Sequence, residues 1–443
     1  MNAQSRAQDL LLSGKGILLF RSLLRKSQYW PRERLEAYQY ERCSRLLISA
    51  YENTSYYHEL FWRHDFDPYA AFKSMDDLSK VPLLTKETVR REESRLISAR
   101  AANDSIEYRT SGSTGEVFKG LHSKKHWIME QATVRRHWSW LDYRLFDRMA
   151  IVRSFVPEPG GPLWKHDRLR NFMFFSAYHL NAENAAEYLR FMAKWKPRIL
   201  RGYPSSLYVL AKIAADLQIS IPPLQGILTA SETLLPLYRQ TIESVFGAKV
   251  FDWYGQMEGS TIITECEAHR GMHINSEYGV CELLADEKLG ANERRIVGTA
   301  LHNEAMPFIR YDTGDVAVID ESGGACPCGR GLPTIKSIRG RSDDFLYTPD
   351  GRTIPSVNLY TMMNRYDDVV AFQFVQLRLD VLEVRLRAKH LDAATQAKLL
   401  VDLRARFGES IRFEIRVGAE FVQSVDGKKL VVVSKARGSH DPS

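Results

Sequence analysis

The chain has 443 residues, 44% of them hydrophobic and 26% charged, with a formal net charge of +7 and a sequence pI of about 9.0. This composition is typical of a globular protein with a large apolar core, and a usual size of about 150 residues per domain predicts two or three domains. No apolar run approaches the roughly 20 residues of a transmembrane helix, and residues 16–20 are too few for a signal peptide. Five scattered cysteines argue against a disulfide framework and favour a reduced, cytoplasmic setting.

Residues 19–45 carry much of the excess positive charge, and we expect them to form a basic helical surface. No RNP, zinc-finger or helix-turn-helix motif accompanies this charge, so a nucleic-acid partner is not expected. Contact of residues 10–30 with a membrane surface is the weaker alternative.

Hydroxyl residues and glycines fill residues 110–115 of the segment YRTSGSTGEVFK. Such a loop offers backbone N–H groups and hydroxyls to an oxyanion, most often a phosphate. It is not a Walker loop, because Lys119 precedes Gly120 instead of following the last glycine of the loop. By itself, this segment is equally typical of a polar hairpin.

Residues 181–255 alternate predicted helices and strands. Asn181 is a suitable N-cap for a helix that stops at Pro197, and Gly247 ends a later helix. The expected order is a strand at 199–203, a helix from 204 to about 217, a strand at 226–230, a helix before Gly247 and a strand at 249–254. This alternation predicts a parallel sheet covered by helices.

Ligands of such sheets gather at the carboxyl ends of the strands. Three polar clusters fall at these ends: residues 202–203, 230–232 and 254–258. We therefore expect a binding site at this edge of the sheet.

The pattern changes after residue 340. Residues 370–388 alternate apolar and polar side chains as paired strands do, residues 391–407 have the period of an amphipathic helix, and residues 411–417 alternate again. The predicted fold class is therefore α/β, with a large N-terminal domain of mainly parallel sheets flanked by helices, residues 1–340, and a small α+β C-terminal domain, residues 341–443.

Several motifs follow one another in a fixed order: YRTSGSTG, TASE (229–232), WYGQMEG (253–259), RYDTGD (310–315), GRSDD (340–344) and DGKK (426–429). This ordered set resembles the adenylate-forming superfamily of acyl-CoA synthetases, luciferases and peptide-synthetase adenylation domains, over nearly the whole chain. The segments ECEAHRGMH and CPCGRGLP are most similar to the branch of phenylacetate–CoA ligase, coenzyme F390 synthetase and CapK-like proteins.

The resemblance implies an ATP and AMP site, with Tyr254 stacked on adenine, Asp315 accepting hydrogen bonds from the ribose hydroxyls and Glu258 binding Mg²⁺. Lys119 would add charge beside the phosphates. The other implied nucleotide-site residues are Thr110, Ser111, Gly112, Ser113, Thr114, Gly115, Ser231, Glu232, Trp253, Gly255 and Arg341.

The resemblance also implies two catalytic residues, Glu258 and Lys428, with Lys429 as the alternative to Lys428. In the family, such a lysine on a mobile small domain stabilises the charge that shifts to pyrophosphate. Asp343 stands where the family has its hinge between domains.

Two cysteine and histidine clusters suggest a structural Zn²⁺ site. Cys326 and Cys328 lie in a glycine-rich segment, and Cys266 is followed by two histidines. Thiolates and imidazole suit tetrahedral Zn²⁺, and the resemblance strengthens this interpretation. The predicted ligands are Cys266, His273, Cys326 and Cys328, with His269 as the alternative to His273.

The resemblance implies an AMP-forming acid–CoA ligase that activates an aryl or other apolar carboxylic acid as an acyl-adenylate and transfers it to CoA. Tyr203, Trp253 and Met257 are the predicted lining of the acyl pocket. The alternatives are transfer to an amine, a sugar or a carrier-protein thiol, or adenylyl transfer to a cofactor. A non-enzymatic zinc-stapled scaffold is a further alternative, against which Glu258, Asp315 and Lys428 argue.

Overall fold

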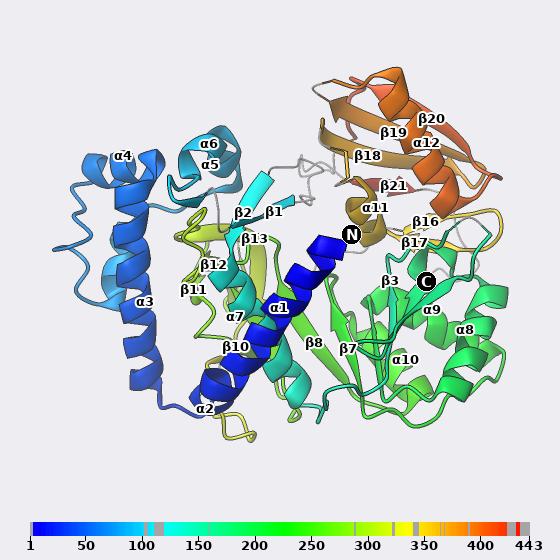
Figure 1. The fold of residues 1–443 in the computed structure, drawn as a ribbon, viewed down its shortest axis with the longest axis horizontal. Coiled ribbons are helices and arrows are strands. Elements are labelled where there is room, and N and C mark those ends of the chain that lie inside the picture. The colour runs from blue at the N-terminus through cyan, green and yellow to red at the C-terminus, as the bar shows by residue number, and fades with distance from the viewer. Residues whose placement is uncertain are drawn as a thin grey trace. The chain divides into compact units, whose positions relative to one another are not determined.

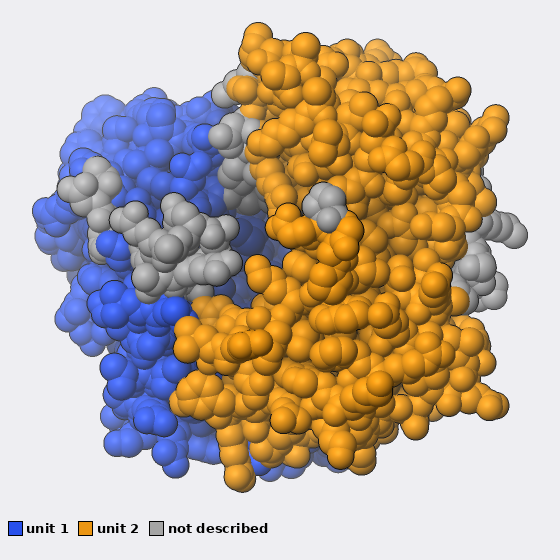
Figure 2. Space-filling view, turned by 45° about the vertical axis from the view of Figure 1, so that its right-hand side comes forward, with its two compact units in different colours: residues 1–109, 118–142, 251–339 blue, residues 110–117, 143–250, 340–443 orange. Residues whose placement is uncertain are grey.

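A computed structural model describes residues 3–101, 105–109, 119–158, 160–287, 289–320, 324–339, 345–363, 365–366, 368–388, 390–422 and 431–434. The predicted phosphate loop, Arg341, Asp343, Lys428 and Lys429 lie outside these residues. The chain divides into two compact units, residues 1–109, 118–142 and 251–339, and residues 110–117, 143–250 and 340–443 (Figure 2). Among the described residues, no helix combines the length and apolarity required to span a membrane.

The first unit contains the N-terminal helices and most of the antiparallel strands (Figure 1). Its helices are α1 Ala3–Leu19, α2 Arg25–Ser27, α3 Arg32–Asn53, α4 Ser55–Arg63, α5 Lys86–Arg91, α6 Glu93–Leu96 and α7 Lys124–Ser139, with a π-helical turn at Phe20–Leu24 and a 3₁₀ helix at Met75–Lys80. Its strands are β1 Ser105–Arg109, β2 Lys119–Ser123, β8 Val250–Gly255, β9 Ile262–Glu265, β10 Met272–Ile274, β11 Val280–Leu284, β12 Glu293–Thr299, β13 Tyr311–Val318, β14 Thr334–Ile335 and β15 Ser337–Arg339.

Three antiparallel arrangements organise this unit. Strands β1 and β2 form a hairpin in which Arg109 pairs with Lys119, so the predicted phosphate loop is the segment that connects them. Strands β8, β9, β10 and β14 pair in that order, and β11, β12, β13 and β15 form a four-stranded sheet. A cluster of buried side chains, including Ile263, Ile296 and Ile335, packs between these strands.

The second unit begins with a mainly parallel sheet. Its strands are β3 Met149–Arg153, β4 Trp164–Asp167, β5 Phe172–Ser176, β6 Ile199–Gly202 and β7 Gly226–Ala230. Strands β7, β6, β3 and β5 are parallel neighbours in that order, and β4 joins the edge antiparallel to β5. A 3₁₀ helix, Ala177–His179, follows β5, and the helices are α8 Ala182–Trp195, α9 Pro204–Asp216 and α10 Pro236–Phe246.

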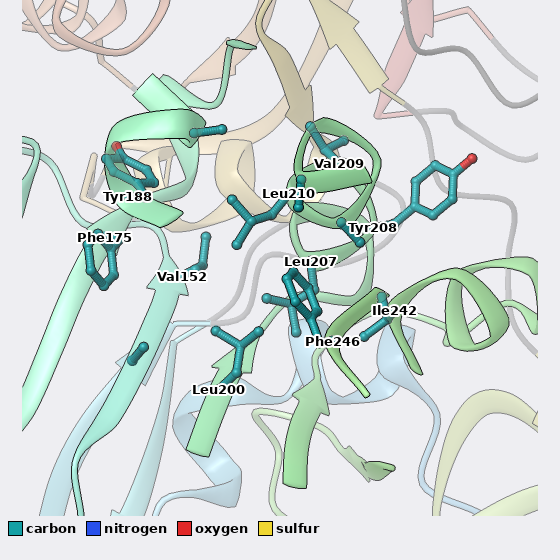
Figure 3. Close-up of a cluster of buried hydrophobic side chains, with 14 of the residues drawn as sticks. Val152, Phe175, Tyr188, Leu200, Leu207, Tyr208, Val209, Leu210, Ile242 and Phe246 are labelled. Carbon is teal, nitrogen blue, oxygen red and sulfur yellow. The ribbon is translucent and has the colours of Figure 1, made fainter. Parts of the chain in front are cut away.

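The predicted alternation of residues 181–255 is confirmed. Asn181 caps α8 through its side chain, which accepts from the N–H of Asn184, and Gly247 ends α10 with φ 64°, a left-handed conformation that favours glycine. Helices α8, α9 and α10 pack their apolar faces onto the sheet, where side chains such as Leu207 and Phe246 meet Leu200 (Figure 3). Hydrophobic burial therefore holds the carboxyl ends of β3, β6 and β7 in one row.

The C-terminal part of the second unit is α+β, as the alternating pattern predicts. Its elements are β16 Phe345–Tyr347, β17 Thr353–Pro355, α11 Ser356–Met363, β18 Val369–Arg378, β19 Val381–Ala388, α12 Ala393–Phe407, β20 Arg412–Val417 and β21 Val432–Ser434. Strands β18 and β19 form an antiparallel pair, whereas β20 lies parallel to β19 and therefore needs the crossover that α12 provides.

One buried arginine joins this part to the rest of the second unit. Arg352 donates to the carbonyl oxygens of Tyr178 at 3.1 Å and Arg406 at 2.7 Å. The hydroxyl of Tyr178 donates in turn to the carbonyl of Asn358 at 2.8 Å. These bonds satisfy buried carbonyl groups that would otherwise cost stability.

Candidate nucleotide and metal sites

Glu258 lies in a tight turn that follows β8. The turn closes where the N–H of Gly259 donates to the carbonyl of Gln256 at 3.0 Å, and Gly259 has φ 66°. The Glu258 carboxylate is buried, with 6% of the residue exposed, and Tyr311 Oη donates to its Oε1 at 2.7 Å. Burial, and then the charge of Glu258, raise the pKa of Tyr311, so the phenol remains a donor and fixes the carboxylate.

Tyr254 and Asp315 are also joined in the first unit. Tyr254 belongs to β8 and Asp315 to β13, and Tyr254 Oη donates to Asp315 Oδ2 at 2.9 Å. Burial, and then the charge of Asp315, raise the pKa of Tyr254 well above its usual value. The residues predicted to bind adenine and ribose therefore share a hydrogen bond.

A bulge in β13 explains how Asp315 reaches this position. Asp312 pairs with Val297 and Val316 with Arg295, so β13 has two more residues than β12 between these pairs. Gly314 lies in the bulge with φ 73°, and the N–H of Asp315 donates to Thr313 Oγ1 at 3.1 Å. The sequence DTGD thus forms a bulge that redirects a carboxylate, a frequent role of bulges near binding sites.

The second unit has a polar cluster at the carboxyl ends of β3, β6 and β7. Arg153 Nη2 donates to Ser231 Oγ at 3.1 Å, and the Arg153 guanidinium carbon lies 4.9 Å from the centroid of the Tyr203 ring. Tyr203 Oη also hydrogen-bonds to Ser154 Oγ at 2.8 Å. Ser231 has φ 76°, a conformation that costs a residue with a Cβ about 1–3 kcal/mol and is characteristic of functional sites.

Glu232 follows β7, and its side chain reaches the N-terminus of α9. The backbone N–H and the hydroxyl of Ser205 donate to Glu232 Oε2 at 3.0 and 2.6 Å. A carboxylate is favoured at a helix N-terminus. Burial nevertheless raises the pKa of Glu232 to about 7. The predicted site residue therefore caps a helix and titrates near neutrality.

The three residues predicted to line the acyl pocket have different surroundings. Tyr203 belongs to the second unit and is buried. In the first unit, Met257 is 50% exposed, and Trp253 packs against a cluster that contains Ile262 and Tyr278. A Cβ on Gly255 would lie 3.0 Å from the Trp253 indole nitrogen, so the glycine permits this packing.

Lys119 opens β2 and lies 3.6 Å from Glu107 in an exposed ion pair. Exposed pairs of this kind contribute about 0–1 kcal/mol. The ion pair therefore leaves the lysine free to exchange partners at the base of the predicted phosphate loop.

The four predicted zinc ligands converge in the first unit. Their ligand atoms all lie within 4.8 Å of one another. Cys266 Sγ lies 3.6 Å from Cys326 Sγ, and Cys328 Sγ lies 3.3 Å from His273 Nε2. Tetrahedral zinc, with bonds of about 2.3 Å to sulfur and about 2.0 Å to nitrogen, separates such atoms by roughly 3.6–3.8 Å, so the donor set fits the ion.

The surroundings of this cluster favour metal binding. His273 Nδ1 hydrogen-bonds to the carbonyl of Leu332 at 3.1 Å, which directs Nε2 toward the thiols. Burial lowers the pKa of His273 to about 4, so the ring is neutral. Burial opposes ionisation of Cys328, but hydrogen bonds from Arg330 hold its pKa below the usual value. His269 instead lies 3.1 Å from Glu265 Oε1.

Sequence comparisons agree with the motif order. Residues 346–435 match the family described as the CapK C-terminal domain. Protein CapK of Staphylococcus aureus is 25% identical over 97% of each chain, and the phenylacetate–coenzyme A ligase of Thermus thermophilus is 25% identical over 74% of each. The chain is therefore similar to adenylate-forming proteins of the CapK and phenylacetate–CoA ligase branch.

Solved structures of 2-hydroxyisobutyryl-CoA ligase share the fold of this chain. A complex of that ligase with 2-HIB-AMP and CoA in the thioesterification state gives a TM-score of 0.58 at 19% identity, covering 92% of this chain and 93% of that chain. A postadenylation state gives 0.56 at 18% identity, covering 93% of both chains. The predicted α/β class is thereby confirmed. Through the two curated relatives named as ligases, the chain is also similar to adenylate-forming enzymes of the acid–CoA ligase type.

Sequence reasoning missed two residues of these sites. Tyr311 stands inside the RYDTGD motif, but nothing local indicates that its hydroxyl meets Glu258, which is 53 residues away. Arg153 follows the apolar run Met149–Val152, a signal for a buried parallel strand that ends in a charged residue. Recognising that strand would have placed Arg153 beside the residues that follow β6 and β7.

Proposed function

We propose that this enzyme activates an aryl or other apolar carboxylic acid with ATP in the cytoplasm, releases pyrophosphate, and transfers the acyl group from the acyl-adenylate to CoA. The observation that carries the proposal is the pairing of motif residues of β8 and the turn after it with residues of β13: Tyr254 with Asp315, and Glu258 with Tyr311. Two relatives bear the name phenylacetate–coenzyme A ligase, from Thermus thermophilus and Aromatoleum evansii.

In the proposed adenylation step, the phosphates of ATP are held by the backbone and hydroxyl groups of residues 110–115. Asp315 and Arg341 hold the ribose, and Tyr254 stacks on adenine. Mg²⁺, when bound at Glu258, would neutralise phosphate charge, because a hard cation suits a carboxylate ligand. The hydrogen bond from Tyr311 keeps that carboxylate in place and leaves its second oxygen for the ion.

The polar cluster of the second unit supports a carboxylic acid as substrate. Arg153 is a fixed cation because it contacts both Ser231 and the Tyr203 ring. An arginine held in this way can pair with a carboxylate or a phosphate through two N–H groups. Together with the aromatic ring of Tyr203, it favours an acid with an apolar body.

One observation favours testing acceptors other than CoA. CapK matches 97% of this chain, whereas the two ligases match 74% each, and the C-terminal match is to the CapK domain. In this superfamily the small domain takes part in the second half-reaction, the transfer to the acceptor. The second candidate acceptor is therefore an amine, a sugar or a carrier-protein thiol.

The proposal gives the C-terminal domain a catalytic lysine and a hinge. Lys428 would stabilise the charge that moves onto pyrophosphate, which is an interaction made mainly in the transition state. Rotation about Asp343 would then remove the lysine and admit the acceptor. Lys428→Ala should abolish pyrophosphate exchange with little change in ATP affinity, and Lys429→Ala is its matched control.

The experiment that tests the proposed function is pyrophosphate release with ATP, Mg²⁺ and a panel of acids, measured with and without CoA. Acid-dependent pyrophosphate release with an acyl-CoA product supports the proposal. Release that is acid-dependent but yields no thioester favours the second acceptor class. No acid-dependent release with any acid, from folded protein that binds ATP, contradicts both.

A further inference from the structure

A second group of metal-binding side chains lies apart from the cysteines. His122 is near the end of β2, and His126 and Glu130 are on α7, whose N-cap Ser123 accepts from the N–H of His126. The four-residue spacing places His126 and Glu130 one turn apart on the same helix face. One nitrogen of each histidine and one carboxylate oxygen of Glu130 lie within 4.8 Å of one another.

Each histidine has one ring nitrogen that is buried without a partner. His126 is fully buried, and its Nε2 hydrogen-bonds to Tyr278 Oη at 2.8 Å, while its Nδ1 has no partner among the described residues. His122 is 4% exposed, and its Nε2 is likewise unpartnered in the described part of the chain. The centroids of the two rings lie 4.6 Å apart. Because buried polar atoms are nearly always bonded, two unpartnered nitrogens in neighbouring rings call for an explanation.

The ring contacts match those of metal-ligating histidines. A ligating imidazole usually has its second nitrogen fixed by a protein group. Tyr278 does this for His126. For His122, the backbone of Met257 and Glu258 hydrogen-bonds to the ring. Each ring is thus held by a protein contact and keeps one nitrogen without a partner in the described part of the chain.

The charges of the group also suit a cation. Burial lowers the pKa of His122 to about 4 and that of His126 well below its usual value, so both rings are neutral and can offer a lone pair. Burial raises the pKa of Glu130 to about 7, and among the described residues no lysine or arginine forms an ion pair with it. A bound cation would supply the missing positive charge.

We propose that His122, His126 and Glu130 bind one divalent transition-metal ion of the Zn²⁺ type. Two imidazoles and one carboxylate are a donor set that Zn²⁺ uses in three-ligand sites, where a fourth position stays open to water. This site shares no residue with the cysteine cluster and does not depend on the proposed acid–CoA ligase reaction.

An ion at this position would stabilise the turn that carries Glu258. Gly259 contacts the site so closely that a Cβ there would lie 2.2 Å from His126 Nε2 and 2.9 Å from Tyr278 Oη. The same turn meets His122 through the backbone of Met257 and Glu258. Metal occupancy would therefore rigidify the turn as well as satisfy the two histidine nitrogens.

The test is titration of the full-length protein, freed of added metal, with Co²⁺. Cobalt in this site should give ligand-field bands without thiolate charge-transfer absorption, which distinguishes it from the cysteine cluster. Glu130→Gln, which removes the charge and keeps the shape, should weaken this Co²⁺ binding more than about 100-fold, since even outer-sphere partners cost 10–100-fold. Glu187→Gln on the exposed face of α8 should leave it unchanged.

His122→Asn is the second variant, in case Glu130→Gln does not fold, and circular dichroism checks the fold of each. Loss of the thiolate-free Co²⁺ signal in either folded variant, with the thiolate bands intact, supports the site. The proposal is overturned if wild type shows no such signal. It is also overturned if both folded variants bind Co²⁺ as wild type does. In that case a buried water, and no metal ion, would be the partner of the two histidine nitrogens.

Discussion

Tyr254 Oη donates a 2.9 Å hydrogen bond to Asp315 Oδ2, and this bond ties β8 to the bulge in β13. In the proposed function, the two residues contact the base and the ribose of the same nucleotide. The bond therefore orients the ribose-binding carboxylate before the nucleotide arrives, which reduces the ordering cost of binding.

Asp315→Ala should weaken ATP binding by roughly tenfold or more, because a hydrogen bond to a charged group contributes about 1.5–3 kcal/mol. Tyr254→Phe, which keeps the ring and removes only the hydroxyl, should weaken it less. Isothermal titration of ATP into each variant measures both effects. Asp286→Asn, at a half-buried carboxylate that pairs with Arg295, is the control. Unchanged ATP affinity in Asp315→Ala would refute the assignment.

Tyr311→Phe should reduce adenylation and raise the Mg²⁺ concentration needed for half-maximal rate. The substitution leaves Glu258 Oε1 without its buried donor, at a cost of about 1–3 kcal/mol, and frees the carboxylate to move. Pyrophosphate exchange measured against Mg²⁺ concentration tests this.

Tyr57→Phe is the matched control, since the Tyr57 hydroxyl donates to the carbonyl of Pro307 at 3.1 Å and accepts from the N–H of Ile309 at 3.1 Å. That variant should lose stability without any change in Mg²⁺ dependence. If both phenylalanine variants respond to Mg²⁺ as wild type does, Tyr311 has only a structural role.

The sequence could predict those elements and site residues whose signals lie within a short stretch of chain. The order of β6, α9, β7 and α10 was predictable because caps and breakers such as Asn181, Pro204 and Gly247 act within one turn of chain. The motif order likewise indicated Tyr254, Glu258 and Asp315 without any knowledge of their neighbours.

Contacts set by strand register were not predictable. The Tyr311 bond to Glu258 depends on how β13 lies relative to the turn that follows β8. The bulge at Gly314 depends on a two-residue mismatch between β12 and β13, whereas DTGD alone is typical of a turn. Arg153 reaches Ser231 only because β3, β6 and β7 are neighbours in the sheet. Each of these is a tertiary relationship without a local sequence signal.

Cys328→Ser should lower the zinc content of the purified protein by one equivalent per chain and lower its melting temperature. The serine hydroxyl is a poor zinc ligand, and a structural zinc contributes directly to folding free energy. Elemental analysis and thermal unfolding measure the two effects. Cys281→Ser, at a cysteine outside the cluster, should retain the zinc. Full zinc content in folded Cys328→Ser would exclude the four-ligand site.

Glu232→Gln should stabilise the protein at pH 8 and have little effect at pH 4.5. Burial raises the pKa of Glu232 to about 7 in the folded protein, above an unfolded value of about 4.3. Between these values the folded state binds more protons than the unfolded state, so the free energy of unfolding falls as pH rises toward 7. Above pH 7 the whole penalty of the buried carboxylate is present, and the neutral amide removes it.

The amide oxygen of glutamine can still accept from Ser205, so the cap on α9 is kept. The measurement is the difference in melting temperature between variant and wild type across pH 4.5–8. Using that difference cancels the contribution of Glu130, whose pKa is also raised to about 7. Glu187→Gln, on the exposed face of α8, should give a difference that does not vary with pH. A Glu232→Gln difference that is equally independent of pH would show that Glu232 ionises normally in the folded protein.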